Sequence, residues 1–238
     1  MPASDEQLTV AVGDASFSAV YARPAEPTAT VVVAHGAGAG MGHPFLHGFT
    51  DALNSLGVAT LRFNFPYREA GRKFPDRPPM AIAAWRAAMA AARAQADAHG
   101  DRGPVWAAGK SFGGRMASMA AAEGMDVAGL VYLGYPLHAP GKPEKLRDEH
   151  LYGLGTPMLF LQGTRDTFAT PGILEDVVSR IGPNAVLQWA EGGDHSFAVA
   201  GKKRPAGEVG ASLAAPVAAF IAAHSQGGGP SLTCRSAS

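Results

Sequence analysis

The sequence contains a single cysteine, Cys234, which lies near its C-terminal end. One cysteine cannot form an intrachain disulfide bond, and it excludes zinc sites built from four cysteines. The first residues, MPASDEQLTV, contain no basic region followed by an apolar run, so we expect no signal peptide. We also find no apolar segment approaching the roughly eighteen residues that span a bilayer. These absences favour a soluble cytoplasmic protein with no membrane partner.

An excess of charge of one sign is also absent. Lys and Arg together number 20, and Asp and Glu also number 20, so the formal net charge is zero. Proteins that hold nucleic acid through its phosphates usually carry a basic excess. The balance therefore argues against a nucleic-acid partner, and against a protein that charge holds at a membrane surface.

What is present is enough apolar material for one core. Hydrophobic residues make up 47% of the 238 residues, and this length is typical of one α/β domain. No internal repeat or domain linker interrupts the chain. Residues 225–238 are rich in Gly and Ser, so we expect a disordered tail behind a single domain over residues 1–224.

The hydrophobic pattern alternates strands with helices after an opening hairpin. Two short runs, residues 8–12 and 17–21, flank a Gly-Asp turn and predict an antiparallel hairpin. Further strands are expected at 30–34, 58–63, 105–108, 127–133, 157–161 and 185–189. Helices are expected at 44–56, 80–98, 115–123, 171–181 and 207–223. Such alternation predicts an α/β fold with a mostly parallel sheet and helices on both faces.

The motif G-x-S-x-G occupies residues 109–113, GKSFG, between the expected strand 105–108 and the helix 115–123. Strand, motif and helix in this order predict a nucleophile elbow, with Ser111 exposed at the tip of a tight turn. Side chains at the two glycines would collide with the neighbouring strand or helix. A glycine-rich turn without chemistry is the simpler alternative, and the partners available to Ser111 decide between the two.

A serine hydroxyl needs a base to become a nucleophile, and the base needs a group that fixes its tautomer. Among the eight histidines, His195 alone lies in a loop directly after a C-terminal strand. Asp166 follows the strand before that one, so we expect it at the same sheet edge as Ser111. Glu191 and Asp194 are weaker rivals for the acid. Asp166 could instead cap the following helix.

The chemistry also needs backbone N–H groups that point at a developing oxyanion. Phe112 follows the expected nucleophile and would supply one N–H. Ala37 would supply the other, because it lies in the loop 35–40, HGAGAG, directly after a buried strand. A phosphate-binding loop is an alternative for HGAGAG, but no Lys-Ser/Thr pair follows it and it forms no G-x-G-x-x-G.

The segments HGAGAG, GKSFGG, GTRD and GGDHSF follow one another in an order that resembles the α/β-hydrolase superfamily. The resemblance covers residues 8 to 223, and within the superfamily the chain is similar to small, lidless hydrolases grouped near the dienelactone hydrolases. It implies Ser111 as nucleophile, Asp166 as acid and His195 as base. It also implies the N–H groups of Ala37 and Phe112 as the oxyanion hole.

One departure from the dienelactone hydrolases limits what the resemblance implies. Those enzymes use a cysteine nucleophile, whereas the motif here carries serine, so their lactone substrate does not carry over. The same branch also resembles a hydrolase-like domain of chromatin-associated complexes. A non-catalytic interaction module therefore stays open as an alternative.

The segment 136–157 is too short for a helical lid domain, so we expect an open site. The basic loop 64–79 follows a strand beside the elbow, and it would either attract an anionic group of the substrate or form a solvated surface. We expect the loops at the strand ends to surround the cavity, and four side chains of these loops are the candidate substrate contacts. They are Tyr67, Arg72, Tyr135 and His138.

These observations predict a serine hydrolase that cleaves small carboxylic esters through an acyl-enzyme intermediate. Its expected partner is a small-molecule ester, without cofactor or metal. A thioesterase or peptidase of the same fold remains an alternative, because the same three side chains serve all of these reactions. The oligomeric state stays open.

Overall fold

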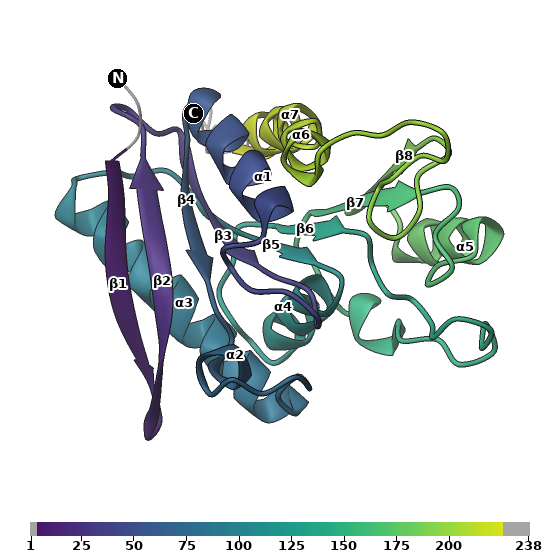
Figure 1. Ribbon diagram of the computed structural model, residues 1–238, viewed down its shortest axis with the longest axis horizontal. Coiled ribbons are helices and arrows are strands. Elements are labelled where there is room, and N and C mark those ends of the chain that lie inside the picture. The colour runs from purple at the N-terminus through teal and green to yellow at the C-terminus, as the bar shows by residue number, and fades with distance from the viewer. Residues whose placement is uncertain (1–3, 226–238) are drawn as a thin grey trace, which may run out of the picture.

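The computed structural model describes residues 4–225, which form one eight-stranded sheet with helices on both faces (Figure 1). The strands are Ser4–Val12 (β1), Ala15–Arg23 (β2), Ala29–Ala34 (β3), Val58–Phe63 (β4), Val105–Lys110 (β5), Leu130–Leu133 (β6), Met158–Gly163 (β7) and Ala185–Ala190 (β8). The helices are Pro44–Ser55 (α1), Pro66–Glu69 (α2), Pro78–Ala98 (α3), Phe112–Ala122 (α4), Pro171–Ile181 (α5), Ala206–Ala211 (α6) and Ala214–Ser225 (α7). Residues 226–238 of the expected tail lie outside the described residues.

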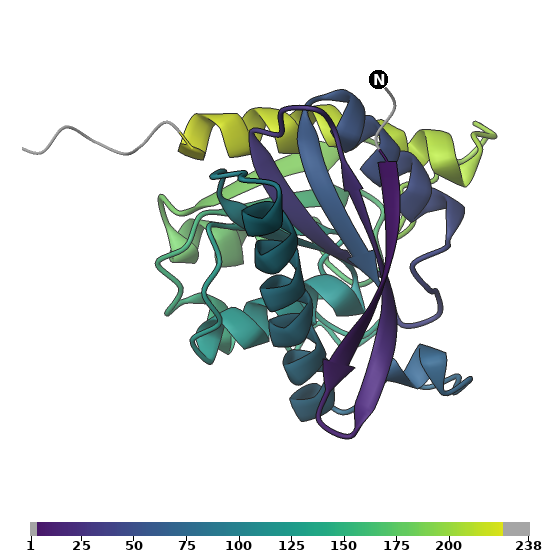
Figure 2. The ribbon, with the colours of Figure 1, turned by 90° about the vertical axis from the view of Figure 1, so that its left-hand side faces the viewer.

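The order of strands across the sheet is β1-β2-β4-β3-β5-β6-β7-β8. β1 pairs with β2 and β2 with β4 in antiparallel fashion, and every other neighbouring pair is parallel. Figure 2 shows the hairpin of β1 and β2 at the edge, with the long helix α3 running beside it. The predicted mostly parallel sheet with an N-terminal hairpin is therefore confirmed.

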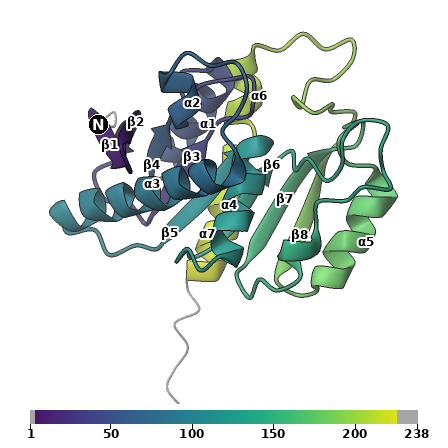
Figure 3. The same ribbon diagram turned by 90° about the horizontal axis from the view of Figure 1, so that it is seen from below.

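The two faces of the sheet bury separate apolar clusters. In β3, Val32 and Ala34 face the cluster beneath α3, α4 and α5, whereas Val31 and Val33 face the cluster beneath α1, α6 and α7. Figure 3 shows α3, α4 and α5 together on the near face. All six residues of β3 are buried, as expected of a central parallel strand covered on both sides.

Several element boundaries differ from the expectation, and the clearest differences concern α4, α2 and the last helix. α4 begins at Phe112 rather than at Arg115, because Gly113 and Gly114 are helical despite their low helix propensity. The loop 64–79 contains the short helix α2, which begins at a proline, the residue most often favoured at a first helical position.

The last expected helix is divided in two. The division between α6 and α7 falls near Ser212, whose hydroxyl donates to the Val209 carbonyl at 2.7 Å and competes with the backbone pattern. Together these helices, Ala206–Ser225, are long and apolar enough to cross a membrane by length and composition alone. This corrects the expectation that no such segment exists. Their larger apolar side chains, including Val217 and Phe220, are buried against the sheet.

The segment joining β6 to β7 leaves the carboxyl ends of the strands uncovered by a helical domain. Residues 134–157 contain one 3-10 helix, Glu149–Leu151, and otherwise turns and extended chain. β5, β7 and β8 therefore end at an edge where the loops that follow them can meet.

Candidate active site

The elbow is built by close contact between β5 and α4. A carbon added at Gly109 would lie 2.1 Å from the Gly114 nitrogen, and one at Gly113 would lie 2.7 Å from the His35 carbonyl oxygen. Both glycines are therefore required, as their place in the motif predicts. Ser111 between them has φ +50° and ψ −113°, in the left-handed region that ordinary residues avoid. Such strain costs about 1–3 kcal/mol and is concentrated at functional sites.

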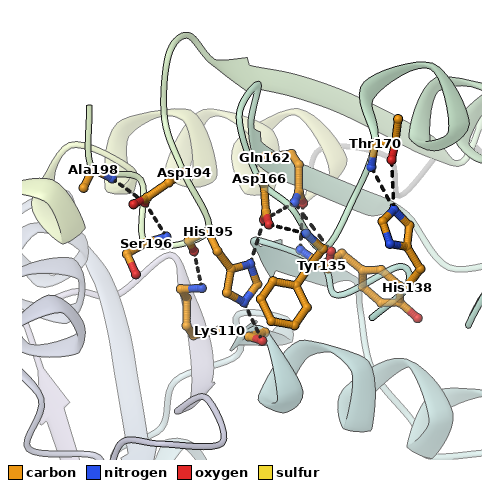
Figure 4. A network of polar contacts seen from close by, with 12 residues as sticks. Lys110, Tyr135, His138, Gln162, Asp166, Thr170, Asp194, His195, Ser196 and Ala198 are labelled. Carbon is orange, nitrogen blue, oxygen red and sulfur yellow. Dashed lines mark hydrogen bonds and ion pairs between the residues drawn. The ribbon is translucent and has the colours of Figure 1, made fainter. Parts of the chain in front are cut away.

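Three expected side chains meet at this edge in series, and Figure 4 labels two of them, His195 and Asp166. His195 Nε2 lies 2.8 Å from Ser111 Oγ, and His195 Nδ1 lies 2.7 Å from Asp166 Oδ2. An ionised carboxylate only accepts hydrogen bonds, so Nδ1 carries the proton and Nε2 accepts from the serine hydroxyl. Asp166 is buried, whereas 22% of the His195 side chain is exposed, so the series runs from the interior to the surface.

Asp166 is held by two further donors. Its Oδ1 accepts from the Phe168 N–H at 2.8 Å, and its Oδ2 accepts from the Gln162 amide at 2.5 Å. Gln162 is itself buried, and its Oε1 accepts from the Tyr135 N–H at 2.7 Å. Sequence reasoning missed Gln162, although a lone polar residue near the end of an apolar strand was a visible signal. The alternative of a helix cap for Asp166 is wrong, because the cap residue of α5 is Thr170.

The two rival acids do not contact His195. Asp194 Oδ1 accepts from the N–H groups of Ser196 and Ala198 at 2.7 and 3.0 Å, which shapes the loop that carries the histidine. Glu191 lies 3.4 Å from the Thr164 hydroxyl. Among the described acids, Asp166 is therefore the partner of His195.

The loop after β3 brings a second backbone N–H to the site. Ala37 and Phe112 both line the cavity that contains Ser111. Within residues 4–225, neither the Ala37 N–H nor the Phe112 N–H donates to a protein group. Both donors are therefore free to serve a substrate oxygen.

His35 and Tyr67 fix the shape of this loop. His35 Nδ1 donates to the Gly36 carbonyl at 2.8 Å, and its Nε2 accepts from the Phe65 N–H at 3.1 Å. Burial lowers the pKa of His35 to about 4, which agrees with a neutral ring that accepts at Nε2. The Tyr67 hydroxyl donates to the Ala37 carbonyl at 2.7 Å.

The expectation that Tyr67 and Arg72 contact substrate is corrected by their surroundings. Tyr67 is fully buried and supports the Ala37 loop instead of lining the cavity. Arg72 forms an ion pair with Asp76, which also accepts the Tyr67 N–H at 2.9 Å. Arg72 therefore stabilises the conformation of the 64–79 segment and does not line the cavity.

Tyr135 and His138 also lie away from the cavity wall. The Tyr135 hydroxyl donates to the Arg147 carbonyl at 2.8 Å. His138 Nε2 accepts from the Thr170 N–H at 3.0 Å, at the start of α5. Both side chains are buried and join segments of the protein, so neither is placed to touch a bound molecule.

Lys110, the variable residue before Ser111 in the motif, contacts the histidine loop. Its Nζ donates to the His195 carbonyl at 2.6 Å and lies 5.8 Å from the centre of the Phe197 ring. Burial lowers the pKa of Lys110 to about 8, against an opposing effect of nearby carboxylates. Sequence reasoning missed this residue because the motif places no demand on its position.

The cavity at this edge has a volume of about 500 Å³. Ser111 and His195 lie on its wall, among apolar side chains that include Phe45, Leu46 and Phe168. Phe168 packs on the His195 ring, with ring centres 4.2 Å apart. Within residues 4–225, no cluster of three or more His, Cys, Asp or Glu side chains could hold a metal ion.

Comparison with known proteins places this geometry in a family. A family model described as an alpha/beta hydrolase domain matches residues 27–225. The chain belongs to the α/β-hydrolase family. A dienelactone hydrolase from Anabaena variabilis superposes with a TM-score of 0.73 at 19% identity, covering 94% of this chain and 99% of that chain.

Two further solved structures share the fold. An α/β serine hydrolase without a lid from Xanthomonas campestris gives a TM-score of 0.67 at 19% identity, covering 97% of this chain and 98% of that one. The esterase domain of a Rhodothermus marinus protein gives 0.68 at 16% identity, covering 92% and 99%. At these identities the similarity establishes a shared fold, and the chemistry has to be argued from this chain's own residues.

Proposed function

We propose that this α/β-hydrolase is a serine esterase that cleaves small carboxylic esters through an acyl-enzyme intermediate. The observation that carries the proposal is the unbroken series of hydrogen bonds from Ser111 through His195 to Asp166. Membership of a hydrolase family supports hydrolysis as the reaction class. The solved esterase structures of the same fold support an ester as the substrate class.

In the acylation step, Ser111 Oγ attacks the ester carbonyl while His195 Nε2 takes the hydroxyl proton. Asp166 stabilises the imidazolium that forms, and the N–H groups of Ala37 and Phe112 stabilise the oxyanion. The tetrahedral intermediate collapses, and His195 returns the proton to the departing alkoxide. The acyl group stays on Ser111.

In the deacylation step, His195 activates a water molecule that attacks the acyl-enzyme. A second tetrahedral intermediate forms in the same oxyanion hole, and its collapse releases the carboxylic acid and restores the serine hydroxyl. The His195 side chain is partly exposed and lines the cavity, which supports access of water to this step. A small-molecule ester as partner, without nucleic acid or membrane, and a cytoplasmic location belong to the same proposal.

The test compares three kinds of acyl bond on one preparation. We expect hydrolysis of 4-nitrophenyl butyrate that is lost in Ser111→Ala and kept in Ser55→Ala, a matched control on the exposed face of α1. A chelator should leave the rate unchanged. If an acyl-thioester or a peptide is turned over faster than every ester tested, the proposed substrate class changes from esters to compounds with that bond. A folded protein inert toward all three would favour the non-catalytic module.

A further inference from the structure

The cavity wall is positively charged. Three cationic side chains line it, Lys110, Arg115 and Arg147, and among the described residues no Asp or Glu lines it. Lys110 already donates to the His195 carbonyl. The charges that need explanation are therefore those of the two arginines.

Arg115 extends from the first turn of α4, four residues after Ser111, where its N–H donates to the Ser111 carbonyl at 3.1 Å. Its Nε is buried, and within residues 4–225 this atom has no hydrogen-bond partner. No described carboxylate pairs with its guanidinium. The other buried polar atoms without a partner belong to neutral side chains that do not line the cavity, so Arg115 is the charged exception.

Arg147 reaches the same cavity from the segment between β6 and β7. Its backbone is fixed on both sides, because its N–H donates to the Leu137 carbonyl at 2.8 Å and its carbonyl accepts from the Tyr135 hydroxyl at 2.8 Å. No described group accepts a hydrogen bond from its guanidinium. The two guanidinium groups line the same cavity. Burial lowers the pKa of Arg115, Tyr135 opposes this effect, and the nearby charge of Arg147 adds to it.

Other arginines with little exposure have partners in this protein. Arg23 makes a two-point contact with Asp101, with nitrogen–oxygen distances of 2.8 and 2.6 Å. Arg62, whose side chain is 5% exposed, pairs with Asp5 at 3.4 Å. Two partly buried like charges without a counterion are unfavourable in the absence of an anion. The counterion missing around Arg115 is therefore one that an occupant of the cavity would supply.

We infer that the substrates of this site carry an oxyanion substituent, a carboxylate or phosphate, which Arg115 and Arg147 bind beside the ester that Ser111 attacks. This inference rests on the proposed esterase function. Guanidinium groups present paired N–H donors that match a carboxylate or phosphate in two-point contacts. Arg115 and Arg147 are thus specificity residues, and neither takes part in proton transfer.

The test measures kcat/KM for matched pairs of esters that differ in one anionic group. Mono-4-nitrophenyl adipate against its neutral methyl ester places the charge on the acyl side. 4-Acetoxybenzoate against its methyl ester, and 4-acetoxyphenyl phosphate against 4-acetoxyanisole, place a carboxylate or a phosphate on the alcohol side. We expect at least one pair to show a preference for the anion of about tenfold or more, the size of a charge-assisted hydrogen bond.

Variants of the two arginines show whether they cause the preference for anionic esters. Arg115→Gln and Arg147→Gln should each reduce the anion-to-neutral ratio by about tenfold, and Arg115→Lys should restore part of it. The matched control is Arg102→Gln, an exposed arginine next to the amino end of β5, which should leave both rates and their ratio unchanged. Anion-to-neutral ratios near one in all three pairs, or ratios that both Gln variants leave intact, would overturn the inference while the esterase proposal stands.

A binding arm separates this inference from the proposed function. In Ser111→Ala protein, adipate or inorganic phosphate should raise the melting temperature, and Arg115→Gln added to that protein should abolish the rise. If no ester is hydrolysed, the esterase proposal fails and this arm alone decides the anion site. The absence of any rise with either anion would then overturn it.

Discussion

The two ends of the parallel sheet differ in the charged side chains that line their hollows. At the amino end of β5, a hollow of about 370 Å³ is lined by charged side chains of both signs, and Arg93 pairs there with Asp126 at 2.9 Å. At the carboxyl end, the cavity beside Ser111 carries cations without carboxylates, and the backbone at Ser111 is strained. Paired charges are explained by the fold itself. The unpaired cations and the strained Ser111 backbone lie together at the carboxyl end, which supports the proposal that this end binds the substrate.

The largest expected effect is the loss of catalysis when the acid at the carboxyl end is replaced. Asp166→Asn should lower kcat by about 10⁴-fold, because an amide no longer fixes the His195 tautomer or stabilises its positive charge. The protein should stay folded, since the side-chain volume is unchanged. Ester hydrolysis at pH 7 with circular dichroism as the folding control checks this, and a loss below tenfold would remove Asp166 from the mechanism.

The next largest effect is a loss of stability when a side chain is added at the elbow of the same end. Gly109→Ala should destabilise the protein by more than about 3 kcal/mol, because the added carbon meets the α4 backbone, which cannot move away. Gly172→Ala, where a carbon meets nothing within 4 Å, is the control and should not lower stability. Urea unfolding of both variants measures the difference. Equal midpoints would show that the elbow is looser than its geometry implies.

Much of the fold was predictable because buried strands and the elbow have strong local patterns. The order of Ser111, Asp166 and His195 was also visible, since each follows a strand that ends at one edge. Substrate contacts were not predictable in the same way. Tyr67 and Tyr135 sit in the loops expected to form the cavity, but their rings point into the protein, and side-chain direction in a loop has no sequence signature.

Other residues of the site were missed for a related reason. Gln162 was hidden inside a strand, and Lys110 was hidden at a variable position of the motif. Arg115 marked only the expected start of a helix. Lys110 depends on the His195 carbonyl, 85 residues away in the sequence, and Arg115 depends on its place in the cavity, so no local pattern reveals either role.

A further prediction concerns Lys110, which supports the loop that carries His195 at the carboxyl end. Lys110→Met should lower kcat by about tenfold with a smaller change in KM, because the loop that carries His195 loses its hydrogen bond to the ammonium group. Lys142→Met, which removes an exposed charge, is the matched control. An unchanged kcat in Lys110→Met would mean that the loop is held by its other contacts alone.

A pH dependence should follow from His35. Its pKa is about 4 in the folded state and about 6.5 in the unfolded chain, so the unfolded state binds more protons as the pH falls below 6.5. Stability should therefore decrease from pH 6.5 downward, by about 2 kcal/mol at pH 5 from this residue. His35→Gln, which keeps a donor and an acceptor, should flatten this part of the urea-unfolding profile. Part of the slope should remain, because burial also lowers the pKa of His150 to about 4. Identical slopes would contradict the assignment.

The smallest effect compares a paired arginine with an unpaired one. Arg23→Met should lower the free energy of unfolding without changing kcat/KM, since its partner Asp101 loses a two-point contact far from the site. Arg115→Met should leave the free energy of unfolding unchanged or raise it, because it removes a partly buried charge without a partner. A larger loss of stability in Arg115→Met than in Arg23→Met would reverse the comparison.

The most direct measurement is labelling with a fluorophosphonate probe, followed by peptide mapping of the modified protein. We expect one probe per chain, attached to Ser111, with labelling abolished in Ser111→Ala and strongly slowed in His195→Ala. A folded wild-type protein that stays unlabelled, or one labelled at a different residue, would contradict it.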